Sequence, residues 1–268
     1  MQIIGNGFVA GHLSDAFADR FPEVTAYAAG VSSTSVTDPA QFDREAELLY
    51  DMLRDCRRRG GTALFFSTAS FAMYGFPAVP GVEDGPLFPP TVYGRHKLAL
   101  ESAVRSAGVE FLILRPSHLV GSHQRSHQLI PALAEQVQRG RVTVLRGAHR
   151  DLLDVKDLMR VIGRLLADGV RGVAVNVASG APQPVESVVD GIERRLGMTA
   201  ERVELPGAPS ITLASIRRVQ ELVPGFRAGL SGPEYLDLLL DTYLPCYTDS
   251  SHPAGPARAG IALGRTGS

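Results

Sequence analysis

Short apolar runs alternate along the chain with longer stretches in which apolar residues recur every three or four positions. The short runs predict strands at Gln2–Ile4, Val24–Ala29, Thr62–Ser67, Val109–Leu114, Val142–Leu145 and Gly172–Val177. The longer stretches predict helices over Phe8–Arg20, Pro39–Arg59, Tyr93 to about Gly108, Ile130–Arg139, Lys156–Ala167 and Val185–Leu196. Strands that alternate with helices predict βαβ units, and therefore an α/β fold with a mainly parallel sheet and helices on both faces.

The segments without this periodicity are rich in proline, glycine and serine. Residues 76–90 carry repeated prolines and are predicted to form a loop. Residues 246–268 consist mainly of Ser, Gly, Pro, Ala and Arg, which predicts a disordered tail. We therefore expect one folded unit over residues 1–245.

The composition is that of an ordinary soluble protein and excludes several classes. The 268 residues are 44% hydrophobic and 21% charged with a net charge of −1, so nothing indicates binding to nucleic acid or to an anionic membrane. No apolar run approaches a membrane span, and no secretory signal or metal motif is present, since the two cysteines, Cys56 and Cys246, lie far apart. A reducing, cytoplasmic compartment and no bound metal are the expectation.

A glycine-rich turn follows the first predicted strand. Gly5-Asn6-Gly7-Phe8-Val9-Ala10 has the spacing G-x-G-x-x-A and opens the first helix. The first glycine permits the tight turn, the second lets a pyrophosphate approach the backbone, and the small third residue allows close packing of helix on strand. The helix N-terminus then faces the anion, which predicts a Rossmann-like dinucleotide site at this turn.

A tyrosine and a lysine stand four residues apart in the third predicted helix. The chain has seven tyrosines and only two lysines, so a chance Tyr-x-x-x-Lys pair is expected about 0.05 times (7 × 2/268), yet Tyr93 and Lys97 form one. At this spacing both side chains share one helix face. A cation beside a phenol favours phenolate, so Lys97 is expected to lower the pKa of Tyr93 toward neutrality for proton exchange with a carbinol or carbonyl.

Together these segments resemble the extended short-chain dehydrogenase/reductases, an NAD(P)-dependent epimerase/dehydratase family that acts on nucleotide sugars. The resemblance covers most of residues 2–200. Besides the glycine turn and the Tyr93/Lys97 pair, it is carried by Ala28-Ala29-Gly30, by the Ser67–Gly75 segment, by Leu114–Gly121, by Arg150–Leu158 and by Asn176–Gly180.

The resemblance implies a set of site residues. Tyr93 would be the acid/base, Lys97 would lower its pKa and hold the nicotinamide ribose, and Ser70 would be the hydroxyl partner, with Ser67 and Thr68 as alternatives. The other cofactor-binding residues would be Gly5, Asn6, Gly7, Phe8, Val9, Ala28, Ala29, Gly30, Ser67, Pro116, Ser117 and His118. The substrate would contact Ser70, Phe71, His123, Arg125, Gln128 and Arg150; His123 could equally be a solvated loop residue.

The chain also departs from the family pattern. If Ala28-Ala29-Gly30 ends the family's fourth strand, the second and third strands are missing, and the adenosine half of the cofactor site is truncated or rebuilt. A right-handed crossover from the first strand to the next would then place the first helix on an unusual face. The resemblance divides the unit into a cofactor-binding core, residues 1–115 and 151–180, and a small substrate-binding lobe, residues 116–150 and 181–245.

The residues after the catalytic hydroxyl bear on the reaction. Family dehydratases place an Asp-Glu pair where this chain has Phe71 and Ala72, and an epimerase/reductase places a cysteine where it has Ala72. The favoured activity is therefore NAD(P)H-dependent reduction of a keto-deoxy-sugar nucleotide, with NADH or NADPH undecided. The alternatives are an NAD-dependent 4-epimerase and a non-catalytic cofactor-sensing or scaffold protein. Relatives usually dimerise through the Tyr-Lys helix and its neighbour, so the resemblance implies a homodimer. Leu98, Val104 and apolar positions of 39–59 are candidate contacts, although they could equally be core residues.

Overall fold

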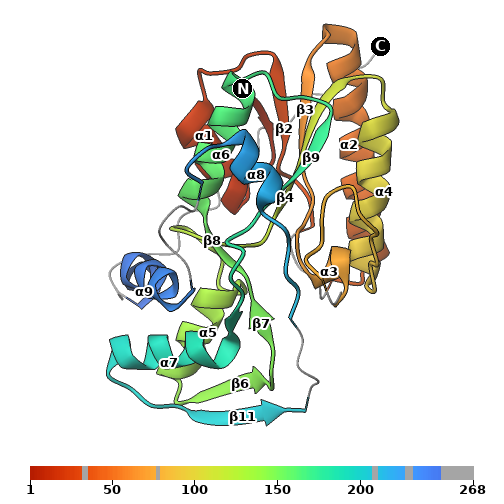
Figure 1. Cartoon of the computed structure of the whole chain (residues 1–268). Coiled ribbons are helices and arrows are strands. Elements are labelled where there is room, and N and C mark those ends of the chain that lie inside the picture. The colour runs from red at the N-terminus through yellow and green to blue at the C-terminus, as the bar shows by residue number, and fades with distance from the viewer. Residues whose placement is uncertain (32–35, 77–78, 207–210, 227–231, 249–268) are drawn as a thin grey trace, which may run out of the picture.

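A parallel sheet forms the centre of the molecule. The computed structural model describes residues 1–31, 36–76, 79–206, 211–226 and 232–248. Within them, five parallel strands lie in the order β1 (Gln2–Ile4), β2 (Val24–Tyr27), β3 (Thr62–Phe66), β4 (Glu110–Pro116) and β9 (Val173–Val177) (Figure 1). The α/β prediction with a parallel sheet is confirmed.

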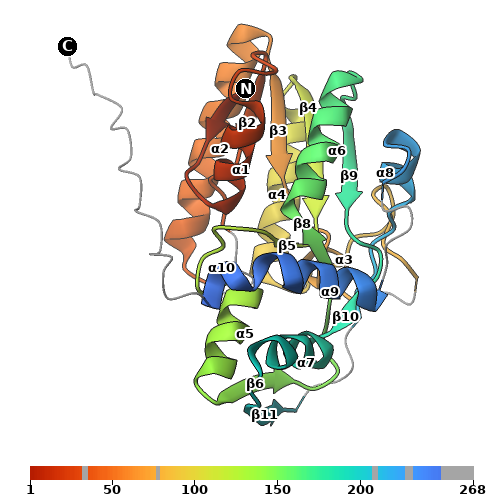
Figure 2. The ribbon, with the colours of Figure 1, turned by 90° about the vertical axis from the view of Figure 1, so that its left-hand side faces the viewer.

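Helices cover both faces of this sheet. On one face, α1 (Phe8–Phe17) and α6 (Val155–Ala167) pack together, and on the other lie α2 (Pro39–Arg59) and α4 (Val92–Ser106) (Figure 2). Alternate side chains of each strand supply the two cores: Ala26 and Leu64 face α1 and α6, whereas Ala63 and Phe65 face α2 and α4. Because successive side chains of a strand point to opposite faces, each strand contributes apolar residues to the cores on both faces of the sheet.

Local signals set the ends of the two helices that carry the site. Asp38 caps α2 by accepting a hydrogen bond from the Ala40 N–H at 3.1 Å, and Gly60, with φ of 64°, ends the helix in the left-handed conformation. Thr91 caps α4 by accepting from the Gly94 N–H at 3.0 Å. The cap fixes where α4 begins and therefore where Tyr93 stands on it.

The strand order resolves the question raised by the short N-terminal half. Strand β1 lies at the sheet edge and pairs directly with β2. The strands β1, β2 and β3 follow one another across the sheet, but α1 and α2 cover opposite faces, so the β1–α1–β2 and β2–α2–β3 crossovers have opposite hands. Parallel crossovers are right-handed in about 98% of cases. The sequence alone left the face of α1 open; the structure places α1 on the face opposite to α2, so one of the two crossovers departs from the usual right hand.

A smaller lobe, with its own apolar core, lies below the sheet in Figure 1. It comprises α5 (Leu129–Gln138), β6 (Arg141–Leu145), β7 (His149–Arg150), β10 (Gln183–Pro184), α7 (Val185–Leu196), β11 (Glu201–Leu205) and α9 (Gly232–Tyr243). Their apolar faces share one core that includes Ile130, Val188 and Leu239. A short parallel pair, β5 (His118–Val120) with β8 (Leu152–Asp154), joins this lobe to the sheet.

The boundaries differ from the expected ones in two places. Within the segment 181–245, α8 (Arg217–Leu222) packs on β9, where its Val219 joins the core of the sheet rather than that of the lobe. Residues 246–248, which were expected to begin a disordered tail, belong instead to α10 (Pro245–Thr248). The rest of the expected tail, residues 249–268, lies outside the described residues. The four-residue helix α3 (Phe71–Tyr74) is an addition that periodicity did not indicate.

Candidate active site

The glycine turn has the geometry that its sequence predicted. Gly5 has φ of 132°, and a Cβ there would lie 2.4 Å from the carbonyl oxygen of Ala28, so only glycine fits between β1 and β2. A Cβ on Gly7 would meet no atom of the described residues within 4 Å. The first glycine is thus required by packing, and the second leaves open space before the N-terminus of α1, where an anion is favoured.

Tyr93 and Lys97 lie near the N-terminus of α4, and both are buried, at 7% and 3% exposure. The Lys97 Nζ lies 5.7 Å from the centre of the Tyr93 ring. Beside the tyrosine, Gly94 packs on α3 so closely that a Cβ would lie 1.6 Å from the Ala72 carbonyl oxygen. This close contact brings the segment before α3 up to the phenol.

The hydroxyl that bonds directly to Tyr93 is that of Thr68, whereas Ser70 bonds to Thr68. Thr68 forms a side-chain hydrogen bond with Tyr93. Its Oγ1 donates to the Ser70 Oγ at 2.9 Å, and the Ser70 Oγ also accepts from the Ala72 N–H at 3.3 Å as the cap of α3. The structure therefore favours Thr68, an alternative at the sequence level, as the partner of the phenol, with Ser70 one bond further along.

The pKa of Tyr93 does not follow the simple expectation of a lysine-lowered phenol. Burial raises the pKa of Tyr93, Lys97 lowers it, and the carboxylate of Glu45 raises it again, so that the net direction is upward. Glu45 comes from α2 and forms an ion pair of 2.6 Å with Lys97. Sequence patterns did not single out Glu45, since nothing local links it to Lys97.

A cleft of about 160 Å³ opens next to this group, between the sheet and the lobe. Ser70 and Phe71 line it from the start of α3, His118 from β5, and Arg150 from β7. Phe71 stacks on Phe76, with ring centres 5.7 Å apart and planes 4° from parallel. The remaining lining residues are Ala69, Ser117, Leu145, His149, Asp151 and Thr212. The cleft thus combines an apolar wall with a cation at its lobe side.

Two titratable neighbours of Arg150 are tuned by burial. Burial first, and then the positive charge of Arg150, lower the pKa of His118 to about 4, so that its imidazole is neutral at physiological pH. Burial raises the pKa of Asp151, whose carboxylate accepts from the N–H groups of Ser179 and Gly180 at 2.7 and 2.9 Å. Asp151 therefore ties the chain after β9 to the rim of the cleft.

Three predicted substrate contacts do not line this cleft. His123 has a positive φ of 66°, and its ring centre lies 6.5 Å from that of His12 on α1. The Gln128 Oε1 accepts from the Arg125 N–H at 2.7 Å, which closes the turn before α5. The structure thus groups Ser70, Phe71 and Arg150 but leaves His123, Arg125 and Gln128 outside.

A buried polar network joins three of the motifs on which the resemblance rests. Arg115 makes two hydrogen bonds to the Glu101 carboxylate, at 2.8 and 2.6 Å, and donates to the Tyr74 hydroxyl at 2.9 Å. The Tyr74 hydroxyl in turn donates to the Asn176 Oδ1 at 2.7 Å. Because these residues are nearly fully buried, the network fixes β4, β9 and α3 relative to α4.

The residues at the carboxyl edge of the sheet, which faces the lobe in Figure 1, fit a dinucleotide. Open space lies before Gly7, and the Ser67 Oγ, buried at the end of β3, has no hydrogen-bond partner among the described residues. A buried hydroxyl without a partner is costly unless a ligand satisfies it. Pro116 and Ser117 end β4 at the same edge of the sheet, because neighbouring parallel strands finish together.

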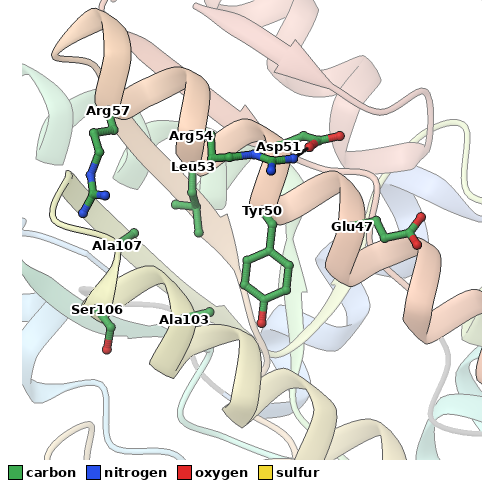
Figure 3. Close-up of a pocket in the computed structure, with 9 residues that line it drawn as sticks. All are labelled: Glu47, Tyr50, Asp51, Leu53, Arg54, Arg57, Ala103, Ser106 and Ala107. Carbon is green, nitrogen blue, oxygen red and sulfur yellow. Dashed lines mark hydrogen bonds and ion pairs between the residues drawn. The ribbon is translucent and has the colours of Figure 1, made fainter.

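A larger hollow lies elsewhere. A groove of about 850 Å³ lies between the outer faces of α2 and α4 (Figure 3), lined by Glu47, Tyr50, Asp51, Leu53, Arg54, Arg57, Ala103, Ser106 and Ala107. None of the predicted site residues lines this groove, whereas Ser70, Phe71, Ser117, His118 and Arg150 line the smaller cleft. Among the described residues, no cluster of three or more His, Cys, Asp or Glu side chains is arranged to hold a metal ion, and no helix has the length and apolarity to cross a bilayer.

Comparison with known proteins identifies the family of this chain. Residues 7–178 match the NAD dependent epimerase/dehydratase family. The chain belongs to this family.

Individual relatives fall in the same group. GDP-6-deoxy-D-mannose reductase of Pseudomonas aeruginosa is 28% identical over 155 residues, 52% of this chain and 51% of the relative, so the match spans about half the length of that curated protein. The structure of RMD from Pseudomonas aeruginosa complexed with NADPH superposes with a TM-score of 0.76 at 24% identity, over 90% of this chain and 97% of the other. A UDP-galactose 4-epimerase superposes with a TM-score of 0.74 at 20% identity, over 88% and 96% of the two chains.

Proposed function

We propose that this protein is an NAD(P)H-dependent reductase of a keto-deoxy-sugar nucleotide. The observation that carries the proposal is the buried Tyr93/Lys97 pair on α4, joined through Thr68 to Ser70 in a cleft whose far side holds Arg150. The likeness to GDP-6-deoxy-D-mannose reductase supports reduction over the other reactions of the family.

Each group of residues in the site has a separate role in the proposed reaction. Bound NAD(P)H would supply the hydride, held by the glycine turn, Ser67, Lys97 and the 116–118 segment. Tyr93 donates the proton to the carbonyl oxygen of the substrate, and Thr68 and Ser70 hold that oxygen by hydrogen bonding. Arg150 binds the diphosphate, since its guanidinium fork matches phosphate oxygens.

The apolar residues at the start of α3 do not favour elimination of water, because that reaction needs carboxyl groups at these positions. Phe71 lies where a dehydratase needs a carboxyl group, and its ring is stacked on Phe76 rather than exchanging protons. Ala72, the next residue, is fully buried. Neither side chain can carry a proton, so these two positions lack the carboxyl groups that elimination of water needs.

The first test is a titration of the purified protein with NADPH and NADH, followed by cofactor fluorescence. Reversible binding of a reduced cofactor, together with oxidation of that cofactor when a 4-keto-6-deoxy-sugar nucleotide is added, is the expected result. NAD carried through purification would instead favour a 4-epimerase, and no binding of any cofactor would favour a scaffold protein.

The second test removes the proposed proton donor. Tyr93→Phe should lower turnover by about 10²–10⁴-fold while the circular dichroism spectrum stays native. A matched control is Tyr243→Phe in the lobe, which also loses one hydroxyl hydrogen bond, to Asp154 at 2.8 Å, but lies in the lobe core and not in the cleft. Turnover in Tyr93→Phe equal to that of the control would refute the role of the phenol.

We also propose a homodimer formed by α2 and α4 in a reducing, cytoplasmic setting. Of the earlier candidates, Val104 is fully buried in the molecule's own core, whereas Leu98 is partly buried beside another core cluster. The groove in Figure 3, with Tyr50 51% exposed at its edge, supports this face instead. Light scattering after gel filtration should give twice the monomer mass, and Tyr50→Glu should give the monomer; a wild-type monomer at all concentrations would overturn the proposal.

A further inference from the structure

A completely buried carboxylate lies against the lysine of the site. Glu45, on α2, is 0% exposed, and its Oε1 accepts a hydrogen bond from the Lys97 Nζ at 2.6 Å. Ionised carboxylates are almost never fully buried unless they are paired, because leaving water costs several kcal/mol. The pair is therefore an arrangement that the rest of the structure has to hold together.

The second oxygen of this carboxylate is also fixed. The Glu45 Oε2 accepts from the Val31 N–H at 2.8 Å and lies 3.3 Å from the His96 Nε2. The main-chain oxygen of Glu45 accepts from the Tyr27 hydroxyl at 2.8 Å. Groups from the end of β2, from α2 and from α4 thus meet at one point, and the carboxylate has no freedom to turn away from Lys97.

The chain beyond β2 closes over the pair. A Cβ on Gly30 would lie 2.5 Å from the Glu45 Oε1 and 2.7 Å from the Lys97 Nζ, so only glycine fits there. Gly30 ends the Ala28–Gly30 segment that the family resemblance places beside the cofactor. The ion pair therefore lies directly under the proposed cofactor site.

The hydrogen bonds of the ammonium group show what remains available. Lys97 has three N–H donors: one bonds Glu45, and another reaches the Phe66 carbonyl oxygen at 3.5 Å. Within the described residues, the third has no partner. Glu45 thus orients the ammonium so that one donor is left for a ribose hydroxyl.

We propose that Glu45 is a positioning residue of this site, which holds Lys97 beside Tyr93 and cancels enough of its charge to keep the phenol protonated. The inference rests on the proposed function and deepens it, since reduction of a carbonyl starts from a protonated tyrosine. The titratable and charged groups around the phenol and the pair are Lys97 and His96 from α4, Glu45 from α2 and Tyr27 from β2; Arg44 of α2 is exposed and acts on Tyr27. Thr68 adds a hydroxyl contact.

The electrostatics agree with this geometry. Burial raises the pKa of Tyr93, Lys97 lowers it and Glu45 raises it. Burial alone would raise the pKa of Glu45, but contacts with His96, Lys97 and the Val31 N–H hold it down at about 2. Glu45 is therefore ionised throughout the working range of pH, and its effect on the phenol is permanent.

The test is Glu45→Gln, which keeps the shape of the side chain and removes its charge. Tyrosinate absorbance is titrated in the wild type and in the variant, each with and without Tyr93→Phe, so that the difference isolates Tyr93. Because Lys97 loses its counter-charge, the titration midpoint of Tyr93 should fall by about one pH unit or more, and the basic limb of the kcat/KM profile should move with it. The phenol titration needs no substrate, so it decides the role of Glu45 even if no sugar nucleotide is reduced.

The matched control is Glu101→Gln, which breaks the other buried ion pair on α4, that of Glu101 with Arg115. It should destabilise the fold to a similar degree and leave the Tyr93 midpoint unchanged. A Glu45→Gln midpoint equal to that of the control, or higher than in the wild type, would overturn the proposal. If Glu45→Gln does not fold, Glu45→Asp carries the test, because it withdraws the charge from Lys97; it should give a smaller shift in the same direction, and no shift would overturn the proposal.

Discussion

The contact between α3 and α4 at Gly94 makes the sharpest prediction, through the substitution Gly94→Ala. The new Cβ would lie 1.6 Å from the Ala72 carbonyl oxygen, whereas ordinary van der Waals contact begins at 3.4 Å, so the two helices must separate by about 1.8 Å (3.4 − 1.6). The neighbour is backbone and cannot rotate away. Overpacking of this kind costs about 1–3 kcal/mol, occasionally more, and a contact this short belongs at the upper end.

The same movement should impair the chemistry. Separating α3 from α4 moves Tyr93 away from the Thr68–Ser70 pair, and a misplacement of about 1 Å can cost about 10²-fold in rate. We expect Gly94→Ala to lower the free energy of unfolding by about 3 kcal/mol and turnover by about 10²-fold. Urea denaturation followed by circular dichroism gives the first quantity, and cofactor oxidation with a keto-sugar nucleotide gives the second.

Gly11→Ala is the control, because Gly11 is also inside a helix but its Cβ would meet no described atom within 4 Å. That variant should be neutral, or more stable by about 0.4–1 kcal/mol, through the entropy of the unfolded chain. Equal urea midpoints and equal turnover for Gly94→Ala and Gly11→Ala would refute the argument that the α3–α4 contact positions the phenol.

Three further outcomes are expected. Tyr74→Phe should lower the free energy of unfolding by about 1–3 kcal/mol in urea titrations, because its buried guanidinium and amide partners each lose a hydrogen bond; an unchanged midpoint would contradict this. Arg150→Ala should raise the KM for a nucleotide sugar about tenfold or more, whereas Arg125→Ala, outside the cleft, should not, and equal effects in steady-state kinetics would count against the cleft. His118 stays neutral in the fold with a pKa of about 4 against 6.5 in the unfolded chain. Its contribution is therefore intact above pH 6.5 and lost as the pH falls toward 4, so His118→Gln should flatten stability against pH in that window, and an unaltered slope would argue against it.

The parts of this protein that could be predicted from the sequence are those with a local cause. The periods of two and 3.6 are properties of a strand and a helix by themselves, so the helices 39–59 and 185–196 were predicted to the residue. The glycine turn and the pair of Tyr93 and Lys97 are equally local, since a fixed spacing on a known element already sets the geometry. Short elements such as α3 and β10 were missed because they are too brief to show a period.

The composition of the site depended on contacts between distant segments. Glu45 and Lys97 are 52 positions apart and meet only because α2 packs beside α4. The contact of Thr68 with Tyr93 joins residues 25 positions apart, and no spacing within the Ser67–Gly75 segment encodes it.

The sequence by itself therefore determined the α/β fold, the glycine turn, the Tyr93/Lys97 spacing and the family, because each depends on a few neighbouring residues. Only the tertiary structure decided the hand of the first crossover, the residues that line the cleft, and the net direction of the Tyr93 pKa. The physical reason is that burial and charge act through space: Lys97 alone would lower that pKa, but the low-dielectric interior and the carboxylate of Glu45 reverse its effect.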